Sequence, residues 1–162
     1  MLIPIWQRLL GILIYMLPWS DTEEAFAQSL NQAPEIIRLV FSLLYLPAFP
    51  ILLLQRTLPY GVGSLILFLG LFLAVVRNPK VPYFLRFNTL QALLLSIILA
   101  VLEFGFFGIL KLSPEDYLIF STLSTTVMVA MLAIVIFALI ECLRGREPDL
   151  PGISQAVRMQ LY

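Results

Sequence analysis

The sequence contains no histidine and only one cysteine, and these two shortages remove large classes of chemistry. Histidine is the commonest metal ligand, the commonest general base and the usual axial ligand of haem. Cys142 alone cannot form an internal disulfide or build a thiolate cluster. No Ser–Lys pair and no pair of membrane aspartates is apparent to take over these roles. We therefore predict a protein that is not an enzyme, with no catalytic site, no metal site and no cofactor.

Charged residues are scarce as well. They make up 12% of the 162 residues, whereas a typical soluble domain has about 25%. Apolar residues make up 60%, and the mean hydropathy of +0.97 leaves too few polar side chains to cover a water-soluble globule. The ten basic and ten acidic residues cancel, which argues against nucleic-acid binding. The expected solvent is a lipid bilayer.

Long apolar stretches fill most of the chain and predict its fold class, an all-α integral membrane protein. A helix needs about 20 apolar residues to cross a bilayer. We expect four transmembrane helices, at about 36–54, 58–76, 87–110 and 117–140. The last three have no interior proline or basic residue, so each can satisfy its own backbone in lipid. The first contains Pro47 and Pro50, which predict a kink or break near Pro47.

The N-terminal part of the chain has a different character. Pro4 and Pro18 enclose only 13 residues, fewer than a comfortable membrane span. We expect residues 1–19 to form an interfacial or re-entrant helix, with a full span as the open alternative. A capping-box spacing from Ser20 predicts a short surface helix over 21–32. The predicted organisation is therefore an interfacial N-terminal segment (1–35), a membrane helical bundle (36–143) and a cytoplasmic or stromal tail (144–162).

Basic residues gather in two places and predict the orientation. The segment 77–86 and the tail carry three each, whereas the expected connections at 55–57 and 111–116 carry one each. Because basic segments stay on the cytoplasmic side, we expect 77–86 and both termini to face the cytoplasm or stroma. The connection at 55–57 should then lie on the opposite side, and Cys142 should lie at the inner end of the last helix.

Polar side chains recur along one edge of the third expected helix and on one face of the fourth. The first set falls within roughly 140° on a helical wheel, so this edge should face protein or water. Small hydroxylated residues on the fourth helix favour close helix packing over lining a path. A carboxylate inside a span, here Glu103, marks a site or a partner, or else lies at the interface or stays protonated. This candidate polar edge comprises Asn88, Gln91, Ser96, Glu103, Ser121, Ser124 and Thr125.

A family resemblance rests first on residues 75–95, which read VVRNPKVPYFLRFNTLQALLL. This segment strongly resembles the signature of the Tic-twenty family. Members are small membrane subunits of the chloroplast inner-envelope import machinery, with homologues in cyanobacteria and red-algal plastids. The signature residues in this chain are Arg77, Asn78, Pro79, Arg86, Phe87, Asn88 and Gln91.

The resemblance extends over most of the chain. Tyr15, Pro18 and Asp21 look like the family's opening segment, and the sequence PGISQAVRMQ at 151–160 is similar to its ending. The family often has a carboxylate where Ser96 stands, so no role for an acid carries over to that position.

The resemblance implies a four-helix membrane protein that helps to move precursor proteins across a membrane with other subunits. The alternative function is that of a small accessory or assembly subunit of a photosynthetic or other multisubunit membrane complex. The expected partners are other membrane-protein subunits and the lipid bilayer, and precursor proteins, a second copy of the chain and a bound pigment or lipid stay open. The expected membrane is a cyanobacterial plasma or thylakoid membrane, or the plastid inner envelope.

Overall fold

The computed structural model describes residues 3–31, 34–57, 62–110 and 117–161, and in these ranges it consists of helices without a β-strand. In chain order the helices are α1 (Ile5–Ile14), α2 (Met16–Asn31), α3 (Glu35–Tyr45), η1 (Leu46–Ala48), α4 (Phe49–Arg56), α5 (Val62–Leu71), η2 (Phe72–Val76), α6 (Tyr83–Glu103), η3 (Phe104–Ile109), α7 (Tyr117–Leu143) and α8 (Ile153–Leu161). The predicted all-helical fold class is confirmed for this part of the chain.

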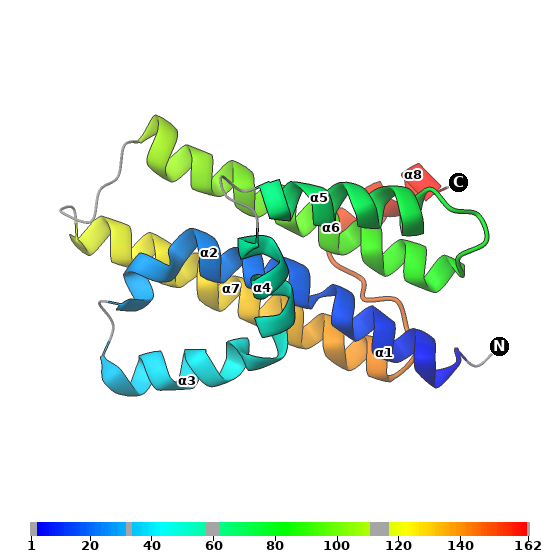
Figure 1. Ribbon diagram of the computed structural model, residues 1–162, viewed down its shortest axis with the longest axis horizontal. Helices are drawn as coiled ribbons and strands as arrows, with labels where there is room; N and C mark the ends of the chain where they lie inside the picture. The colour runs from blue at the N-terminus through cyan, green and yellow to red at the C-terminus, as the bar shows by residue number, and fades with distance from the viewer. Residues whose placement is uncertain (1–2, 32–33, 58–61, 111–116, 162) are drawn as a thin grey trace.

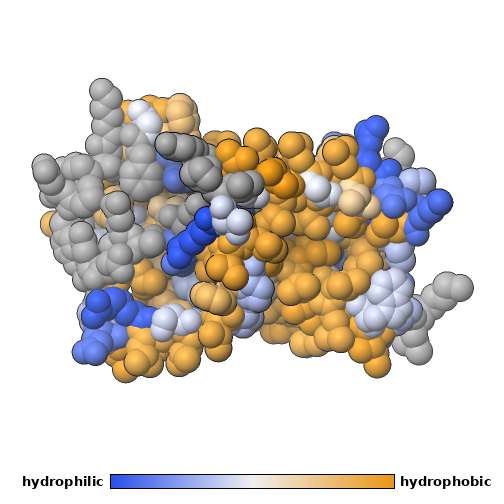
Figure 2. Space-filling view, in the orientation of Figure 1, coloured by the Kyte–Doolittle hydropathy of each residue, from blue (hydrophilic) through white to orange (hydrophobic). Residues whose placement is uncertain are grey.

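The helices run back and forth along the long axis of the molecule (Figure 1). The chain crosses the molecule through α1 and α2, returns through α3, α4 and α5, crosses again through α6 and η3, and returns through α7. Both termini lie at one end, together with the connection between η2 and α6. Hydrophilic residues gather at this end, while the middle of the same face is largely apolar (Figure 2).

Within the described ranges, three helical segments are long and apolar enough to cross a membrane. They are Glu35–Arg56, Tyr83–Phe106 and Leu118–Leu143. The last two match the spans expected at 87–110 and 117–140, and α6 begins directly after Pro82, whose missing N–H is harmless there. Residues 58–61 lie outside the described residues, and the apolar helix that is described, Val62–Val76, is shorter than a span, so the expected helix at 58–76 is not clearly a fourth one.

The segment Glu35–Arg56 is broken where Pro47 and Pro50 interrupt it, as the sequence predicts. Between α3 and α4 lies the short 3₁₀ helix η1, and α4 then runs across the long axis of the molecule (Figure 1). At about 1.5 Å per residue, the 11 residues of α3 are about 16 Å long. The 10 residues of α5 and the 5 of η2 add about 22 Å. Each of the two is shorter than a hydrocarbon core of about 30 Å, and only the two in series are long enough to cross it.

Because α4 turns sideways, the connection expected at 55–57 does not lie at an end of the bundle. Gln55 is only 2% exposed, and the backbone of this residue contacts Gly63 at the start of α5. Pro47 and Pro50 have no backbone N–H to donate, so the helix is interrupted at these residues. The chain therefore changes direction inside the bundle instead of at its end.

The N-terminal helices lie against the long apolar helices. Both α1 and α2 contact α6 and α7. The expected surface helix at 21–32 is part of α2, in which Thr22 and Phe26 have no exposed area. Thr22 and Ser20 donate their hydroxyls to backbone carbonyls one turn earlier, which hides their polarity.

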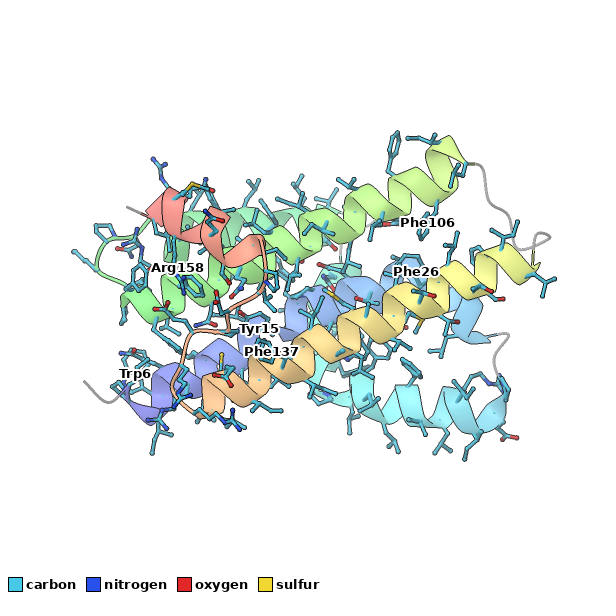
Figure 3. The ribbon with its side chains drawn as sticks, turned by 180° about the vertical axis from the view of Figure 1, so that it is seen from behind. Trp6, Tyr15, Phe26, Phe106, Phe137 and Arg158 are labelled. Carbon is cyan, nitrogen blue, oxygen red and sulfur yellow. The ribbon has the colours of Figure 1, made fainter. Side chains whose placement is uncertain are left out.

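Aromatic side chains fix this helix pair in place. Trp19 stacks on Tyr45 of α3, with ring centroids 4.3 Å apart, and its indole N–H donates to the carbonyl of Leu44. Phe26 meets Phe106 of η3 edge to face. Figure 3 shows both Tyr15 and Phe26 inside the molecule. These contacts tie α2 to the elements on either side of it.

The close crossing of α4 and α5 can be tested at Gly63. A Cβ atom there would overlap the backbone of Gln55, whereas a Cβ at Gly70 would meet nothing within 4 Å. We expect Gly63→Ala to destabilise the fold by about 1–3 kcal/mol, because backbone cannot move aside as a flexible side chain can. Gly70→Ala should be neutral or slightly stabilising, because alanine favours helix. Thermal unfolding of both variants in mild detergent measures the difference, and equal Tm values would contradict the crossing.

Candidate functional site

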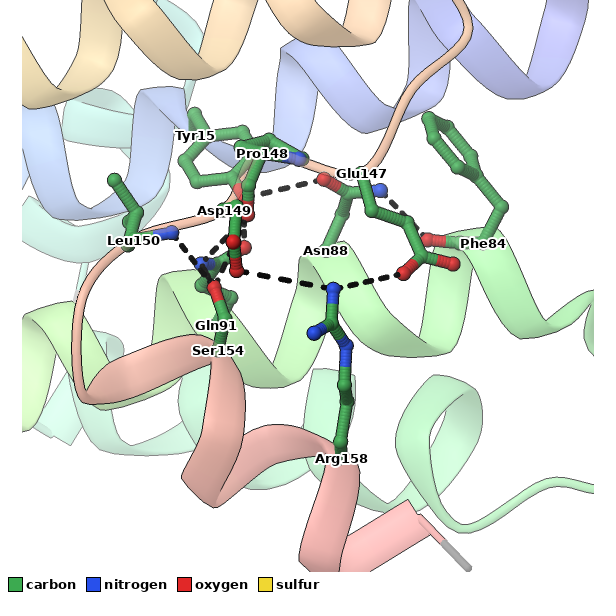
Figure 4. A network of polar contacts seen from close by, with 10 residues as sticks. All are labelled: Tyr15, Phe84, Asn88, Gln91, Glu147, Pro148, Asp149, Leu150, Ser154 and Arg158. Atoms are coloured by element: carbon green, nitrogen blue, oxygen red, sulfur yellow. Dashed lines mark hydrogen bonds and ion pairs between the residues drawn. The ribbon is translucent and has the colours of Figure 1, made fainter.

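A buried polar network joins the N-terminal helices to α6. The hydroxyl of Tyr15 lies 2.8 Å from Gln91 Oε1 and 3.1 Å from Asn88 Oδ1, and it donates its proton to this pair of amide oxygens (Figure 4). Asn88 Nδ2 donates to the carbonyl of Phe84, 2.7 Å away and one turn earlier. Tyr15, Asn88 and Gln91 have no exposed area. Because buried polar groups need partners, this network can form only when these helices are packed together.

Gln91 extends the network to the tail. Its Nε2 donates to Ser154 Oγ at 2.9 Å and to the carbonyl of Pro148 at 3.2 Å. Ser154 Oγ also accepts the backbone N–H of Leu150 at 2.7 Å. Gly152 precedes α8 with φ +76°, a left-handed conformation that favours glycine and turns the chain back onto α6. One glutamine side chain thus holds α8 against the bundle.

Arg158 of α8 continues the contact at the surface. Its guanidinium lies over the ring of Phe87, 5.6 Å from the ring centre, and faces the carboxylates of Glu147 and Asp149 at 3.7 Å and 3.8 Å. Figure 4 shows Arg158 between the two carboxylates. The side chain of Arg158 is 46% exposed, so these ion pairs are screened by water and contribute little.

The signature segment before α6 forms a tight connection. Asn78 Oδ1 accepts the backbone N–H of Lys80 at 3.0 Å, a turn that asparagine favours. Arg86 Nε donates to the carbonyl of Val76 at 2.9 Å and so satisfies the end of η2. Arg77 is exposed, and Pro79 lies within the turn. These residues set the angle between η2 and α6, and Phe87, Asn88 and Gln91 follow on the buried side of α6.

The candidate polar edge is split among four places. Asn88 and Gln91 belong to the network with Tyr15. Ser96 and Glu103 line a separate cavity nearer the middle of the molecule. On α7, Ser124 is 1% exposed and packs inside the bundle. Ser121 and Thr125 instead line a shallow hollow on α7 with Thr122, Thr126, Val129 and Ala130.

The central cavity lies among α2, α5 and α6 and has a volume of about 460 Å³. Its polar lining comes from Asp21, Ser64, Ser96 and Glu103. Gln55 Nε2 donates to Asp21 Oδ1 at 2.6 Å, so α4 orients this carboxylate. Beside it, Arg56 pairs with Glu23 at 2.8 Å, and a hydrophilic patch interrupts the apolar surface near α4 (Figure 2). The broken segment α3–α4 thus brings polar groups to the middle of the bundle.

Several of these residues were not identified as site residues from sequence. The sequence predicts Gln55 in a connection at the membrane surface and Ser64 in an apolar span. Ser154 matched the family's ending without a role. The available signal was the occurrence of lone amides and hydroxyls within or next to apolar stretches, because such groups need partners in lipid.

Cys142 lies at the end of α7, as expected, but it has no exposed area. Its Sγ lies 3.3 Å from Asn88 Oδ1, inside the polar network. The thiol is therefore no surface reporter of orientation. Within the described residues, no group of three His, Cys, Asp or Glu side chains is close enough to hold a metal ion.

The network makes a direct prediction at Tyr15. Tyr15→Phe removes the donor shared by Asn88 and Gln91 and leaves two amide oxygens in a buried site. We expect a loss of about 1–3 kcal/mol in the free energy of unfolding. Tyr45→Phe is the matched control, because the buried hydroxyl of Tyr45 has no hydrogen-bond partner among the described residues. Thermal unfolding in mild detergent should show a lower Tm for Tyr15→Phe alone, and an unchanged Tm there would mean that the network does not stabilise the fold.

Comparison of the sequence with known proteins places this chain in a family. The family model described as "Chloroplast import apparatus Tic20-like" matches residues 4–157. A Tic20 family protein of Synechocystis is 33% identical over 156 residues, which cover 95% of this chain and 92% of the relative. The Arabidopsis protein TIC 20-II, chloroplastic, is 30% identical and covered to 74%, and the Gracilaria Tic20 family protein Ycf60 is 30% identical and covered to 77%. With its apolar, helical architecture, this chain is a membrane protein and belongs to the Tic20 family, as its Tic-twenty signature indicates.

Proposed function

We propose that this chain is a membrane subunit of a protein-translocation complex of the Tic type and contributes to the path of precursor proteins. The observation that carries the proposal is the convergence of the family's three matching segments. Tyr15 of the opening, Asn88 and Gln91 of the signature, and Ser154 of the ending meet in one buried network. The family model, which matches residues 4–157, covers all three segments and so supports a function of the family's type for the whole chain.

We further propose that the bundle crosses the membrane four times along its long axis. The crossings are α1 with α2, the broken path of α3, α4 and α5, then α6 with η3, and finally α7. The lengths support this, because α3 and α5 with η2 reach across a bilayer only in series. The four crossings differ from those expected from sequence. The pair α1 and α2 forms one crossing, and the two spans expected at 36–54 and 58–76 together form a single crossing.

In this arrangement both termini face the cytoplasm or stroma. They lie at the same end as the connection between η2 and α6 (Figure 1). Arg8 also lies there, where it donates to the carbonyls of Ile3 and Leu143. The positive-inside rule favours the cytoplasmic or stromal side for this basic end. Its basic residues are Arg8, Arg77, Lys80, Arg86, Arg144, Arg146 and Arg158.

The central cavity is too small to be a polypeptide conduit by itself. Its volume of about 460 Å³ holds only a few side chains. A path for an unfolded chain therefore requires further copies or partner subunits. The exposed apolar residues of α3 support this, because such a surface suits lipid or a neighbouring membrane helix.

The second candidate is a small accessory or assembly subunit of a photosynthetic or other membrane complex. This second candidate is favoured by the hydrogen bonds of the signature residues Asn88 and Gln91, which are made within the same chain. Asn88, Gln91 and Ser154 bond to one another or to other groups of the same chain, which is also what a purely structural subunit would show. The two candidates differ in their companions.

The test is to extract the protein from its native membrane in mild detergent, identify its companions, and crosslink an arrested precursor. A photoreactive residue at Ser96 reports on the cavity, and one at Ser124, which is 1% exposed, is the control. We expect translocation components as companions and precursor crosslinks from Ser96 but not from Ser124. Photosystem or other bioenergetic subunits without any precursor crosslink would replace the transport role by the accessory one.

A further inference from the structure

The outward face of α5 and η2 carries a row of apolar side chains that ends in a cation. Leu65, Leu69, Leu73 and Arg77 follow one another at intervals of four residues, which places them on one face of this helical segment. Each of the three leucines is at least 46% exposed, and Arg77 is exposed as well. In Figure 2 the face over α5 is apolar, and hydrophilic residues follow at the end of the molecule where η2 joins α6. This row is complementary to a lipid molecule with an anionic headgroup.

The positive charges at this end of η2 are not neutralised by the chain. The sequence has no aspartate or glutamate at all over residues 36–102. In the part of the chain that the structure describes, Arg77 and Lys80 form no ion pair, whereas Arg144 and Arg158 of the C-terminal part each face a carboxylate. The charges of Arg77 and Lys80 are therefore available to an anion from outside the chain.

The fold brings a third cation to the same place. Arg86 Nε donates to the carbonyl of Val76 at 2.9 Å, and Val76 directly precedes Arg77 in the chain. Asn78 Oδ1 accepts the backbone N–H of Lys80 at 3.0 Å, which fixes the turn that separates the two exposed cations. Basic residues gathered next to the end of an apolar helix favour anionic lipids. Here the first turn of α6 and the end of η2 supply them together.

We propose that this surface binds an anionic phospholipid, with an acyl chain along the leucine row and the phosphate at Arg77 and Lys80. A guanidinium group donates parallel N–H bonds to phosphate oxygens, so Arg77 is suited to hold the headgroup. A soluble phosphate would meet only the charges, whereas a lipid also covers the apolar side chains of Leu69 and Leu73. A zwitterionic lipid offers the same chains, but its ammonium group opposes the attraction to the cations.

The proposal goes beyond the transport role and does not depend on the companions of the chain. It rests on the proposed crossing of the membrane along the long axis of the bundle, which sets Arg77 at the depth of the headgroups. The test below uses the purified chain without a precursor or a partner subunit. Its outcome therefore leaves the transport role as it stands, and the transport role can fail without affecting it.

The experiment identifies the lipid that lies beside Leu73. A diazirine amino acid is introduced at Leu73, and the purified protein is reconstituted in vesicles of equal parts phosphatidylglycerol and phosphatidylcholine with the same acyl chains. After illumination, mass spectrometry measures which lipid is crosslinked. We expect phosphatidylglycerol to exceed phosphatidylcholine at least about threefold. Crosslinks in the bulk ratio would overturn the proposal and leave the crossing intact, and the absence of any lipid crosslink would overturn both.

Two double variants of the probe-bearing protein separate a site from the general charge of this end. Arg77→Gln with Lys80→Gln should bring the crosslinks close to the bulk ratio. Arg144→Gln with Arg146→Gln removes the same number of positive charges at the end of α7, which packs on α1 and α2 and not on η2, so the excess should remain. All four side chains are exposed, so both variants should fold. Equal losses in the two variants would contradict a site at Arg77.

A last arm distinguishes a lipid headgroup from a free phosphate. The crosslinking is repeated with an excess of soluble glycerol 3-phosphate and, separately, with sodium chloride at the same ionic strength, which controls for screening. We expect the same excess of phosphatidylglycerol in both solutions, because soluble phosphate gains nothing from the leucine row. A larger loss with glycerol 3-phosphate would identify a site for soluble anions and contradict the lipid assignment.

Discussion

Water is absent from the hydrocarbon core of a bilayer, so a polar side chain that is buried there is favourable mainly where another group of the protein pairs with it. That constraint organises the bundle. The hydroxyl of Tyr15 lies between Asn88 and Gln91, and Gln91 in turn reaches Ser154 of the tail. Each of these side chains would be unfavourable alone, and together they hold α1, α2, α6 and α8 in one register. The signature residues Asn88 and Gln91 therefore have a packing role in this chain, because they hold these helices together.

The same constraint explains the broken return path through α3, α4 and α5. Pro47 and Pro50 interrupt the helix, and irregular backbone at membrane depth is tolerated where it is covered by protein or lines a cavity. Here α4 is covered by α2 and α5, and Gln55 and Arg56 pair with Asp21 and Glu23. The break thus creates the polar centre of the molecule, beside the cavity that Ser96 and Glu103 also line.

Sequence reasoning predicted the parts of the fold that depend on local pattern. The uninterrupted apolar stretches of α6 and α7, the restart after Pro82 and the break at Pro47 all follow from hydropathy and proline geometry. The placement of α1 and α2 did not follow from the sequence. Ser20 and Thr22 are polar residues and suggest a surface helix, but their hydroxyls donate to backbone carbonyls one turn earlier and can therefore be buried. Asn88 and Gln91 were found because amides in an apolar helix need partners, whereas their partners Tyr15 and Ser154 lie 73 and 63 residues away in the chain and leave no local trace.

The central claim is that α1 and α2 cross the membrane as part of the bundle, and the position of Glu35 tests it most directly. Single cysteines are introduced as Glu35→Cys and Lys80→Cys, with the buried Cys142 left in place. They are probed with a membrane-impermeant maleimide on sealed, right-side-out vesicles. The account predicts that Glu35→Cys reacts in sealed vesicles and that Lys80→Cys reacts only after permeabilisation. Reaction of both positions from the same side would show that the N-terminal helices do not cross.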